Sequence, residues 1–164
     1  MSIPFASGSV DEARYRESLG HFASGVTIVT ALEQGSPAGV TCQSFSALSL
    51  DPPLVVLAAG RRSTSWPRII KAGTFCVNVL TSSQGALARS FASSSADKFD
   101  GVDWEPSALG APILEGSLAF VECTLDSVIE SGDHNLVVGR VLDLGTREGR
   151  PLLFYRGEFA ELGT

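Results

Sequence analysis

The sequence predicts a mainly β fold, an antiparallel barrel, closed or split, built from roughly six or seven strands with two or three short helices. Short runs of apolar and β-branched residues recur along the chain, each bounded by turn residues. The composition agrees, because 44% of the residues are hydrophobic while 17 Gly and 8 Pro supply many turns. No repeat or linker divides the chain, so one domain is expected over residues 1–164, with residues 1–8 as a loose terminus.

The first expected element is an amphipathic helix over residues 10–23. Ser9 and Glu12 have the spacing of a capping box, in which each side chain bonds the backbone N–H of the other residue. Gly25 ends the pattern, and His21, close to the helix end, is expected to have a structural role. The apolar positions that recur at helical spacing are Tyr15, Leu19 and Phe22.

Strands are expected next. The β-branched run Val26–Leu32 predicts a strand, and a turn at residues 34–37 returns the chain as its hairpin partner. Residues 38–59 then contain two strand-like runs joined by Asp51-Pro52-Pro53, where the prolines force an extended break. The second of these runs, Leu54–Ala59, is uniformly apolar and predicts a buried strand.

The middle of the chain alternates helices and a strand. Ser63 or Thr64 can cap a short helix that Gly73 ends. Thr74–Leu80 predicts a strand, and Ser82–Phe91 predicts a second short helix followed by a serine-rich loop.

The last third begins with a long irregular connection, expected at Asp97–Trp104 and Pro106–Pro112. Leu118–Ile129 alternates as a half-buried antiparallel strand, and His134–Leu144 returns after a Ser-Gly-Asp turn. Pro151–Phe159 supplies a final short strand. The expected polar face of the alternating strand consists of Glu122, Thr124 and Asp126.

Composition excludes several classes of protein. The net charge is −6 and no basic cluster exceeds Arg61-Arg62, so nucleic acid is not an expected partner. The widely spaced Cys42, Cys76 and Cys123 predict buried, reduced thiols in a cytoplasmic protein, and two histidines leave a metal site without ligands. No N-terminal signal segment is visible, and the longest apolar run, Leu54–Ala59, is too short to span a membrane.

Familiar catalytic motifs are absent from the sequence. It contains no G-x-G-x-x-G after a strand, no P-loop, no G-x-S-x-G and no H-E-x-x-H. Neither histidine lies near a candidate nucleophile. If the protein is an enzyme, a cofactor is expected to carry the reaction.

Two stretches could hold such a cofactor. The first run of residues 38–59 carries hydroxyls and amides but no charge, which suits a planar ligand with polar edges, although a solvent-facing strand is an equal alternative. The loop before the helix at Gly73 offers hydroxyls and Arg61 or Arg62 as a phosphate cradle, or else an ordinary helix cap. The polar side chains of the first run are Thr41, Gln43, Ser44, Ser46 and Ser49.

Three motifs resemble signatures of one family in the expected order. They are GVTCQSFSALSLDPPLV, Gly132-Asp133-His134 and Leu153-Phe154-Tyr155-Arg156-Gly157. The chain is similar, from about Tyr15 to Phe159, to the flavin reductase family, the small reductase components of two-component monooxygenases. The resemblance implies an FMN-binding split barrel of Greek-key topology. It also implies an NAD(P)H:flavin oxidoreductase that reduces FAD or FMN by hydride transfer, acts as a homodimer and supplies reduced flavin to a partner monooxygenase.

The resemblance also assigns contacts with the flavin. Residues expected at the ring edge are Thr41, Cys42, Gln43 and Ser44. Ser49 and Leu50 are expected along the ribityl chain. Ala58, Ala59, Ser63, Ser65 and Trp66 are expected around the phosphate end. Ser90 and Phe91 are weaker candidates for contact.

Contacts with the nicotinamide coenzyme come from the two later motifs. The resemblance places His134 beside the nicotinamide in an orienting role; taken alone, the residues favour a turn histidine bonded to Asp133. Tyr155 would pack against the dinucleotide and Arg156 would meet its phosphates, where the alternative is a strand-end aromatic beside a surface arginine.

Other readings remain open from the sequence. The same barrel could hold flavin without reducing it, could act as a pyridoxamine-phosphate oxidase-like FMN enzyme, or could carry an apolar ligand. The choices between FAD and FMN, and between NADH and NADPH, are also open.

Overall fold

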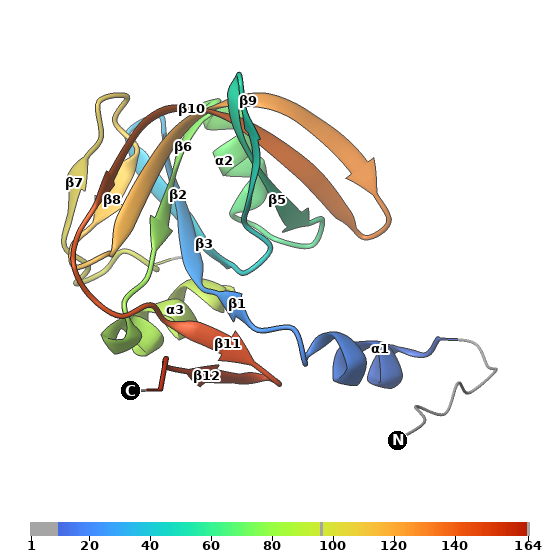
Figure 1. Ribbon diagram of the computed structural model, residues 1–164. Coiled ribbons are helices and arrows are strands. Elements are labelled where there is room, and N and C mark those ends of the chain that lie inside the picture. The colour runs from blue at the N-terminus through green and yellow to red at the C-terminus, as the bar shows by residue number, and fades with distance from the viewer. Residues whose placement is uncertain (1–9, 96, 164) are drawn as a thin grey trace.

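The computed structural model describes residues 10–95 and 97–163, which form three antiparallel sheets and three short α-helices (Figure 1). The seven-stranded sheet has the order β3 (Ser36–Cys42), β2 (Thr27–Glu33), β6 (Thr74–Val79), β9 (Ala119–Ser131), β10 (His134–Thr146), β5 (Pro53–Gly60) and β4 (Ser46–Leu50). A small sheet joins β1 (Ser24–Gly25), β11 (Leu153–Tyr155) and β12 (Glu158–Ala160), and β7 (Trp104–Pro106) pairs with β8 (Pro112–Leu114). The helices are α1 (Glu12–Leu19), α2 (Trp66–Ala72), the 3₁₀ helix η1 (Ser82–Gln84) and α3 (Gly85–Ala92).

The large sheet curls into a split barrel. β3 and β5 are far apart in the strand order, yet they contact each other, so the two sides of the sheet approach one another. α2 packs against β2, β3 and β6, and α3 packs against β2 and β3. The predicted mainly β, antiparallel split barrel is confirmed.

Burial on both faces explains why β2 lacks polar alternation. Val29 belongs to the apolar cluster that contains Trp66 of α2, and Ile28 belongs to a second cluster that contains Phe91 of α3. A strand covered on both faces has apolar residues at successive positions, as at Ile28 and Val29, and the buried hydroxyls of Thr27 and Thr30 donate to carbonyl oxygens.

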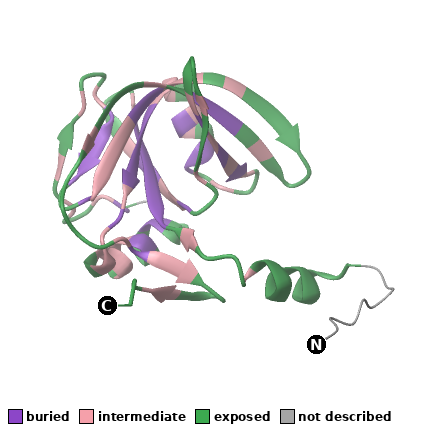
Figure 2. Ribbon diagram, in the orientation of Figure 1, coloured by how far each residue is buried: buried purple, intermediate pink, exposed green. Residues whose placement is uncertain are grey.

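The N-terminal helix is shorter than expected, and its end is tied to the β11–β12 turn by the hydrogen bond from Arg156 N to Gly20 O. Asp11 caps it by accepting a hydrogen bond from the backbone N–H of Arg14 at 2.8 Å, and Gly20 ends it. The predicted cap, Ser9, lies outside the described residues. No side chain of α1 is buried, so the predicted apolar face is exposed (Figure 2).

The connection predicted to be irregular at residues 97–112 contains the β7–β8 hairpin, which corrects that expectation. The Asn78 side chain holds β8 against the sheet: its oxygen accepts from Leu114 N at 2.8 Å and its nitrogen donates to Pro112 O at 3.3 Å. Strands of only three residues, each with a proline at one end, carry too little periodic pattern to be recognised in a sequence.

Glu122 was expected on the solvent face of β9 but is 1% exposed. The connection after β7 covers that face, where Glu122 accepts hydrogen bonds from the hydroxyl of Ser107 and, at 2.8 Å, from Leu109 N. A buried carboxylate is tolerated because these donors replace water.

Two expected strands are each divided. The first run of residues 38–59 forms β3 and β4, separated by the loop Gln43–Phe45. The final strand is a hairpin, β11 and β12, whose turn places Arg156 at φ 51° and Gly157 at φ 87°.

The other expectations about local structure agree with the fold. The predicted helices and strands of residues 60–91 are present with small shifts at their ends. The three cysteines are buried and free. His21 has the expected structural contact, because its Nδ1 lies 2.9 Å from the carbonyl oxygen of Glu17 at the end of α1. Among the described residues, no helix combines the length and apolarity needed to cross a membrane.

Candidate functional site

The end of β3 and the loop after it connect the parts of the candidate site. The Ser44 hydroxyl accepts from Ala58 N at 2.8 Å and donates to Ala58 O at 3.1 Å, which fixes the loop to β5. The Sγ of Cys42 lies 3.2 Å from the same hydroxyl. Burial raises the pKa of the Cys42 thiol, so this sulfur is a structural contact and not a nucleophile.

Thr41 and Gln43 both precede Ser44, the residue that attaches this loop to β5. The Thr41 hydroxyl donates to Ala88 O of α3 at 2.6 Å, so only its backbone is available to a ligand. Gln43 lines an open groove of about 700 Å³ between α1 and the β11–β12 turn. The same groove contains Arg156, so the structure brings these two predicted residues together, with Tyr155 beside them. Its lining also includes Tyr15, Leu19, Phe22 and Phe154.

His134 lies at the tip of the β9–β10 hairpin, held by its neighbour. Its Nδ1 is 2.7 Å from Oδ1 of Asp133, which leaves Nε2 as the ring nitrogen free to meet a substrate. The hydrogen bond from His134 lowers the pKa of the Asp133 carboxyl. Arg61 donates its backbone N–H to Asp133 O at 3.0 Å, so the loop before α2 is attached to this turn.

Strand register brings His134 close to the ring-binding stretch. His134 pairs with Gly60 on β5, and a Cβ on Gly60 would lie 3.6 Å from His134 Nε2. Ala58, which bonds Ser44, is two residues along the same strand, a separation of about 7 Å. Ser44 and His134 are therefore attached to the same end of β5, from opposite edges of that strand, although they are 90 positions apart in the sequence.

The expected phosphate end is built differently from the prediction. Ser63 caps α2 by accepting from Ser65 N and Trp66 N, both at 3.3 Å. The hydroxyl of Ser65 accepts from Nζ of Lys98 at 3.2 Å. The Trp66 side chain is 4% exposed and belongs to the core, so it does not face a ligand.

Lys98 is a functional candidate that the sequence reasoning missed. It is 7% exposed and also donates to Gly39 O at 3.2 Å and Phe91 O at 3.0 Å. No carboxylate of the described residues pairs with it, and burial lowers its pKa. It lines a cavity of about 300 Å³ with hydroxyl groups around it. These hydroxyls come from Thr64, Ser65, Ser94 and Ser95.

The available signal for Lys98 was a single lysine directly after a serine-rich loop, in SSSADKF. Nothing in that pattern indicates that the side chain reaches across to β3. The contact with Gly39 joins residues 59 positions apart, which local sequence does not encode.

Several residues that were predicted to contact the flavin do not line the Lys98 cavity or the Gln43 groove. Phe91 is fully buried behind Gly39, where a Cβ would lie 2.5 Å from its ring, and Ala59 is 1% exposed. The Ser90 carbonyl accepts from Ser93 in a turn. Ser49 and Leu50 pair with Leu54 and Pro53, about 13 Å along β5 from Ala58, so in one protomer they do not lie between ring and phosphate.

Comparison with known proteins agrees with this geometry. The pattern of the flavin reductase-like domain matches residues 19–163. The reductase subunit HsaB of a flavin-dependent monooxygenase from Rhodococcus jostii is 50% identical, over 94% of this chain and 80% of that protein. The NADH-dependent FMN reductase SmoA of Agrobacterium fabrum is 38% identical, over 94% of this chain and 88% of that protein.

A solved structure extends the likeness to three dimensions. The NADH:FAD oxidoreductase SgcE6 of Streptomyces globisporus, in complex with NAD and FAD fragments, superposes with a TM-score of 0.88 at 36% identity, covering 93% of each chain. With the domain match over most of the chain and relatives of this similarity, the protein belongs to the flavin reductase family.

Proposed function

We propose that this protein is the reductase component of a two-component flavin-dependent monooxygenase. It transfers a hydride from NADH to FMN or FAD and releases the reduced flavin to a partner monooxygenase. The proposed activity is supported by the relatives, which are named as a monooxygenase reductase subunit and an NADH-dependent FMN reductase. The structural observation that supports the site is the position of the segment Gly39–Ser44. Gly39 borders the Lys98 cavity and Gln43 borders the groove at α1. Ser44 bonds β5, the strand that pairs with His134.

The residues fit a flavin. The buried Lys98 supplies a positive charge without a carboxylate partner among the described residues, while its three protons already bond Gly39 O, Ser65 Oγ and Phe91 O. The hydroxyls around the cavity supply the donors that a phosphate group requires. The loop at Gln43 is fixed by Ser44, so its backbone is preorganised to bond a polar ring edge. We assign the flavin phosphate to Lys98 and the ring to Thr41–Ser44.

The chemistry needs positioning more than proton transfer. The flavin supplies the hydride acceptor, and one proton comes from solvent, so NADH and oxidised flavin become NAD⁺ and reduced flavin. His134 offers Nε2 to the nicotinamide carboxamide while Asp133 holds its Nδ1. Gln43 and Arg156 offer an amide and a cation to the rest of the dinucleotide.

The protein is further proposed to act as a homodimer. Ile129 is 54% exposed and Leu136 is 38% exposed, and the two pair on one face of the β9–β10 hairpin, in the same row as Ala58. This apolar strip lies beside Ser44 and His134, so a second copy covering it would exclude water next to the site.

NADPH in place of NADH is an alternative reductant for the assay.

We also propose a cytoplasmic location. Burial raises the pKa of the Cys76 and Cys123 thiols to about 12, and no disulfide links any of the three cysteines in the described chain. Reduced thiols and a nicotinamide reductant belong to the same compartment. Fractionation of the source cells should recover the protein with the cytoplasm; recovery in an exported fraction contradicts the location.

The function is tested by mixing the protein, NADH and free flavin and following the nicotinamide absorbance. We expect its loss, with reduced flavin passing through an ultrafiltration membrane that retains the protein. Tight flavin binding without NADH oxidation would identify a non-catalytic flavin protein. FMN-dependent oxidation of an amine without NADH consumption would identify an oxidase, and either result rejects the proposal.

A further inference from the structure

The Lys98 cavity adjoins a second cavity. The second has a volume of about 410 Å³ and shares Pro37, Arg68 and Phe99 with the first. Its remaining lining residues are Ser36, Asp97 and Asp100. The two cavities therefore lie next to each other along β3.

β3 sets the order in which a ligand would meet these cavities. Its last residues lead to the ring-binding loop, Gly39 contacts Lys98, and Ser36 at its start lines the second cavity. Ser36 and Gly39 are about 10 Å apart along an extended strand. A flavin with its ring at Thr41–Ser44 therefore reaches Lys98 with its first phosphate, and anything attached to that phosphate enters the second cavity.

The charges of the two cavities differ. The first contains Lys98, a cation without a carboxylate partner among the described residues. The second is lined by the exposed carboxylates of Asp97 and Asp100. Its one lining cation is Arg68, which also borders the first cavity.

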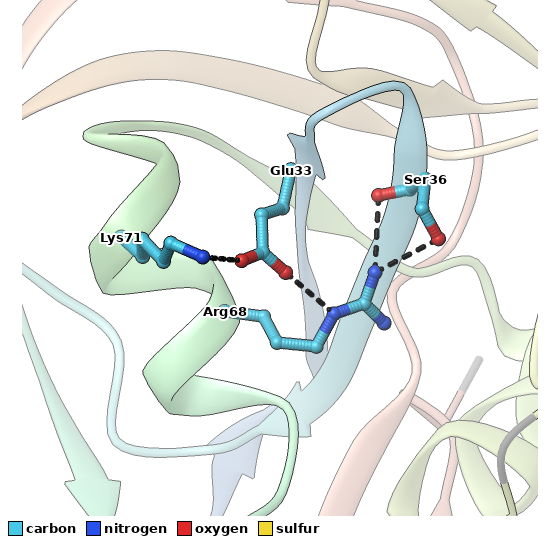
Figure 3. Close-up of polar contacts among 4 residues, drawn as sticks. All are labelled: Glu33, Ser36, Arg68 and Lys71. Atoms are coloured by element: carbon cyan, nitrogen blue, oxygen red, sulfur yellow. Dashed lines mark hydrogen bonds and ion pairs between the residues drawn. The ribbon is translucent and has the colours of Figure 1, made fainter.

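Arg68 is already engaged by other groups (Figure 3). Its Nε donates to Glu33 at 2.9 Å, and one terminal nitrogen donates to Ser36 O at 3.2 Å and Ser36 Oγ at 3.0 Å. Glu33 also accepts from Lys71 at 2.8 Å. The guanidinium is therefore partly neutralised and held toward the β2–β3 turn, which leaves Asp97 and Asp100 to set the sign of the field in the second cavity.

The two flavin nucleotides distribute their charge differently. FMN ends in a phosphate monoester, whose second ionisation has a pKa of about 6, so nearly two charges lie on one phosphorus. FAD carries one charge on each of two phosphates, and its second phosphate would lie in the acidic cavity. We propose that this site selects FMN over FAD, with Lys98 attracting the monoester and Asp97 and Asp100 disfavouring the adenylate half. This inference rests on the proposed function.

The test is equilibrium dialysis of the full chain against FMN, FAD and riboflavin. We expect FMN to bind about tenfold more tightly than FAD, and riboflavin to bind more weakly than FMN. The double variant Asp97→Asn/Asp100→Asn should bring FAD to within about threefold of FMN, as should high salt, since both weaken the repulsion. Asp103→Asn is the matched control, because it removes the same charge from the same connection but lines neither cavity.

Two results overturn the inference alone. FAD binding as tightly as FMN, or an FMN preference unchanged in the double variant, removes its electrostatic basis while NADH-dependent flavin reduction stands. Binding of FAD more tightly than FMN would indicate that Arg68 leaves Ser36 and bonds the second phosphate. That result also overturns the inference that the site selects FMN. Failure of every flavin to bind would reject the proposed function as well.

Discussion

At the scale of single residues, the two nitrogens of His134 have different roles. Asp133 occupies Nδ1, and this contact fixes the orientation of the ring and leaves Nε2 at the surface beside Gly60. An imidazole held in this way is suited to orient a neutral carboxamide, and it has no proton to move in a hydride transfer.

Replacing His134 by Ala should raise KM for NADH about tenfold while the Kd for flavin changes less than twofold. The reason is that the side chain is proposed to meet the nicotinamide and does not line the Lys98 cavity. Steady-state kinetics with flavin binding by dialysis measures both quantities.

His134→Gln keeps a hydrogen-bond donor and should recover part of the NADH affinity. An orienting role also predicts the same pH profile of kcat in wild type and in His134→Gln. A large loss of kcat with KM unchanged would contradict the orienting role and favour proton transfer.

Sequence reasoning found the residues whose neighbours in the chain define a motif. Ser44 and His134 were named in this way, and the fold attaches both of them to the same end of β5. Trp66 and Phe91 were named for their position in the chain, but their size carries them into the core. Lys98 was missed because its role depends on three contacts across the fold, none of which leaves a local pattern.

At the scale of elements, α2 is attached to the β2–β3 hairpin by ion pairs as well as apolar packing. Glu33 at the end of β2 accepts hydrogen bonds from Lys71 and Arg68. Both bonds lower the pKa of the Glu33 carboxyl, and the bond from Lys71 has the larger effect. Because Arg68 also bonds Ser36 across the turn, one carboxylate orients the cation at the junction of the two cavities.

Glu33→Gln should lower the Tm at neutral pH, since it removes the charge that both cations share. A carboxyl whose folded pKa is depressed contributes stability above its ordinary value of 4.5, and loses it as the pH falls through the folded pKa. The difference in Tm between wild type and variant should therefore shrink in acid. Thermal unfolding between neutral and acidic pH measures it.

Glu148→Gln serves as the control for that comparison, because Glu148 is exposed and the described chain gives it no ion pair. A Tm difference for Glu33→Gln that persists unchanged in acid would mean that packing, and not charge, attaches α2.

Elements with strong periodicity were predictable, and those that depend on tertiary support were not. β2, β5 and β6 are long apolar runs and were predicted within about two residues at each end. β7 and β8 exist because Asn78 and the sheet supply partners for short segments. α1 ends earlier than its apolar spacing indicates because no other element of the described chain covers those positions.

At the scale of the whole molecule, exposed apolar side chains gather at its extremities. They occur on α1 and on the outer half of the β9–β10 hairpin, both of which Figure 2 shows mainly as exposed, and also on β4 and at the other end of β10. Large exposed apolar areas next to a functional site are typical of an interface. The fold class was predictable from composition and strand pattern; the surface that a second copy would cover was visible only once the strands were paired.

The double variant Ile129→Glu/Leu136→Glu should convert a dimer into a monomer, because it places charges in the proposed interface. Light scattering across a range of protein concentrations measures the mass. Leu144→Glu is the control, since Leu144 is 62% exposed at the other end of β10. A wild-type protein that is monomeric at all concentrations would reject the homodimer.

The β11–β12 turn has a practical consequence. Arg156 is exposed at its tip with a left-handed backbone, and its N–H bonds Gly20 O at 2.9 Å, tying the C-terminal hairpin to the segment after α1. Trypsin should cut after Arg156 early in a limited digest, since exposed turn tips are preferred cleavage points. Because that peptide bond borders the Gln43 groove, NADH should slow the cut, and the digest would then report occupancy without any turnover.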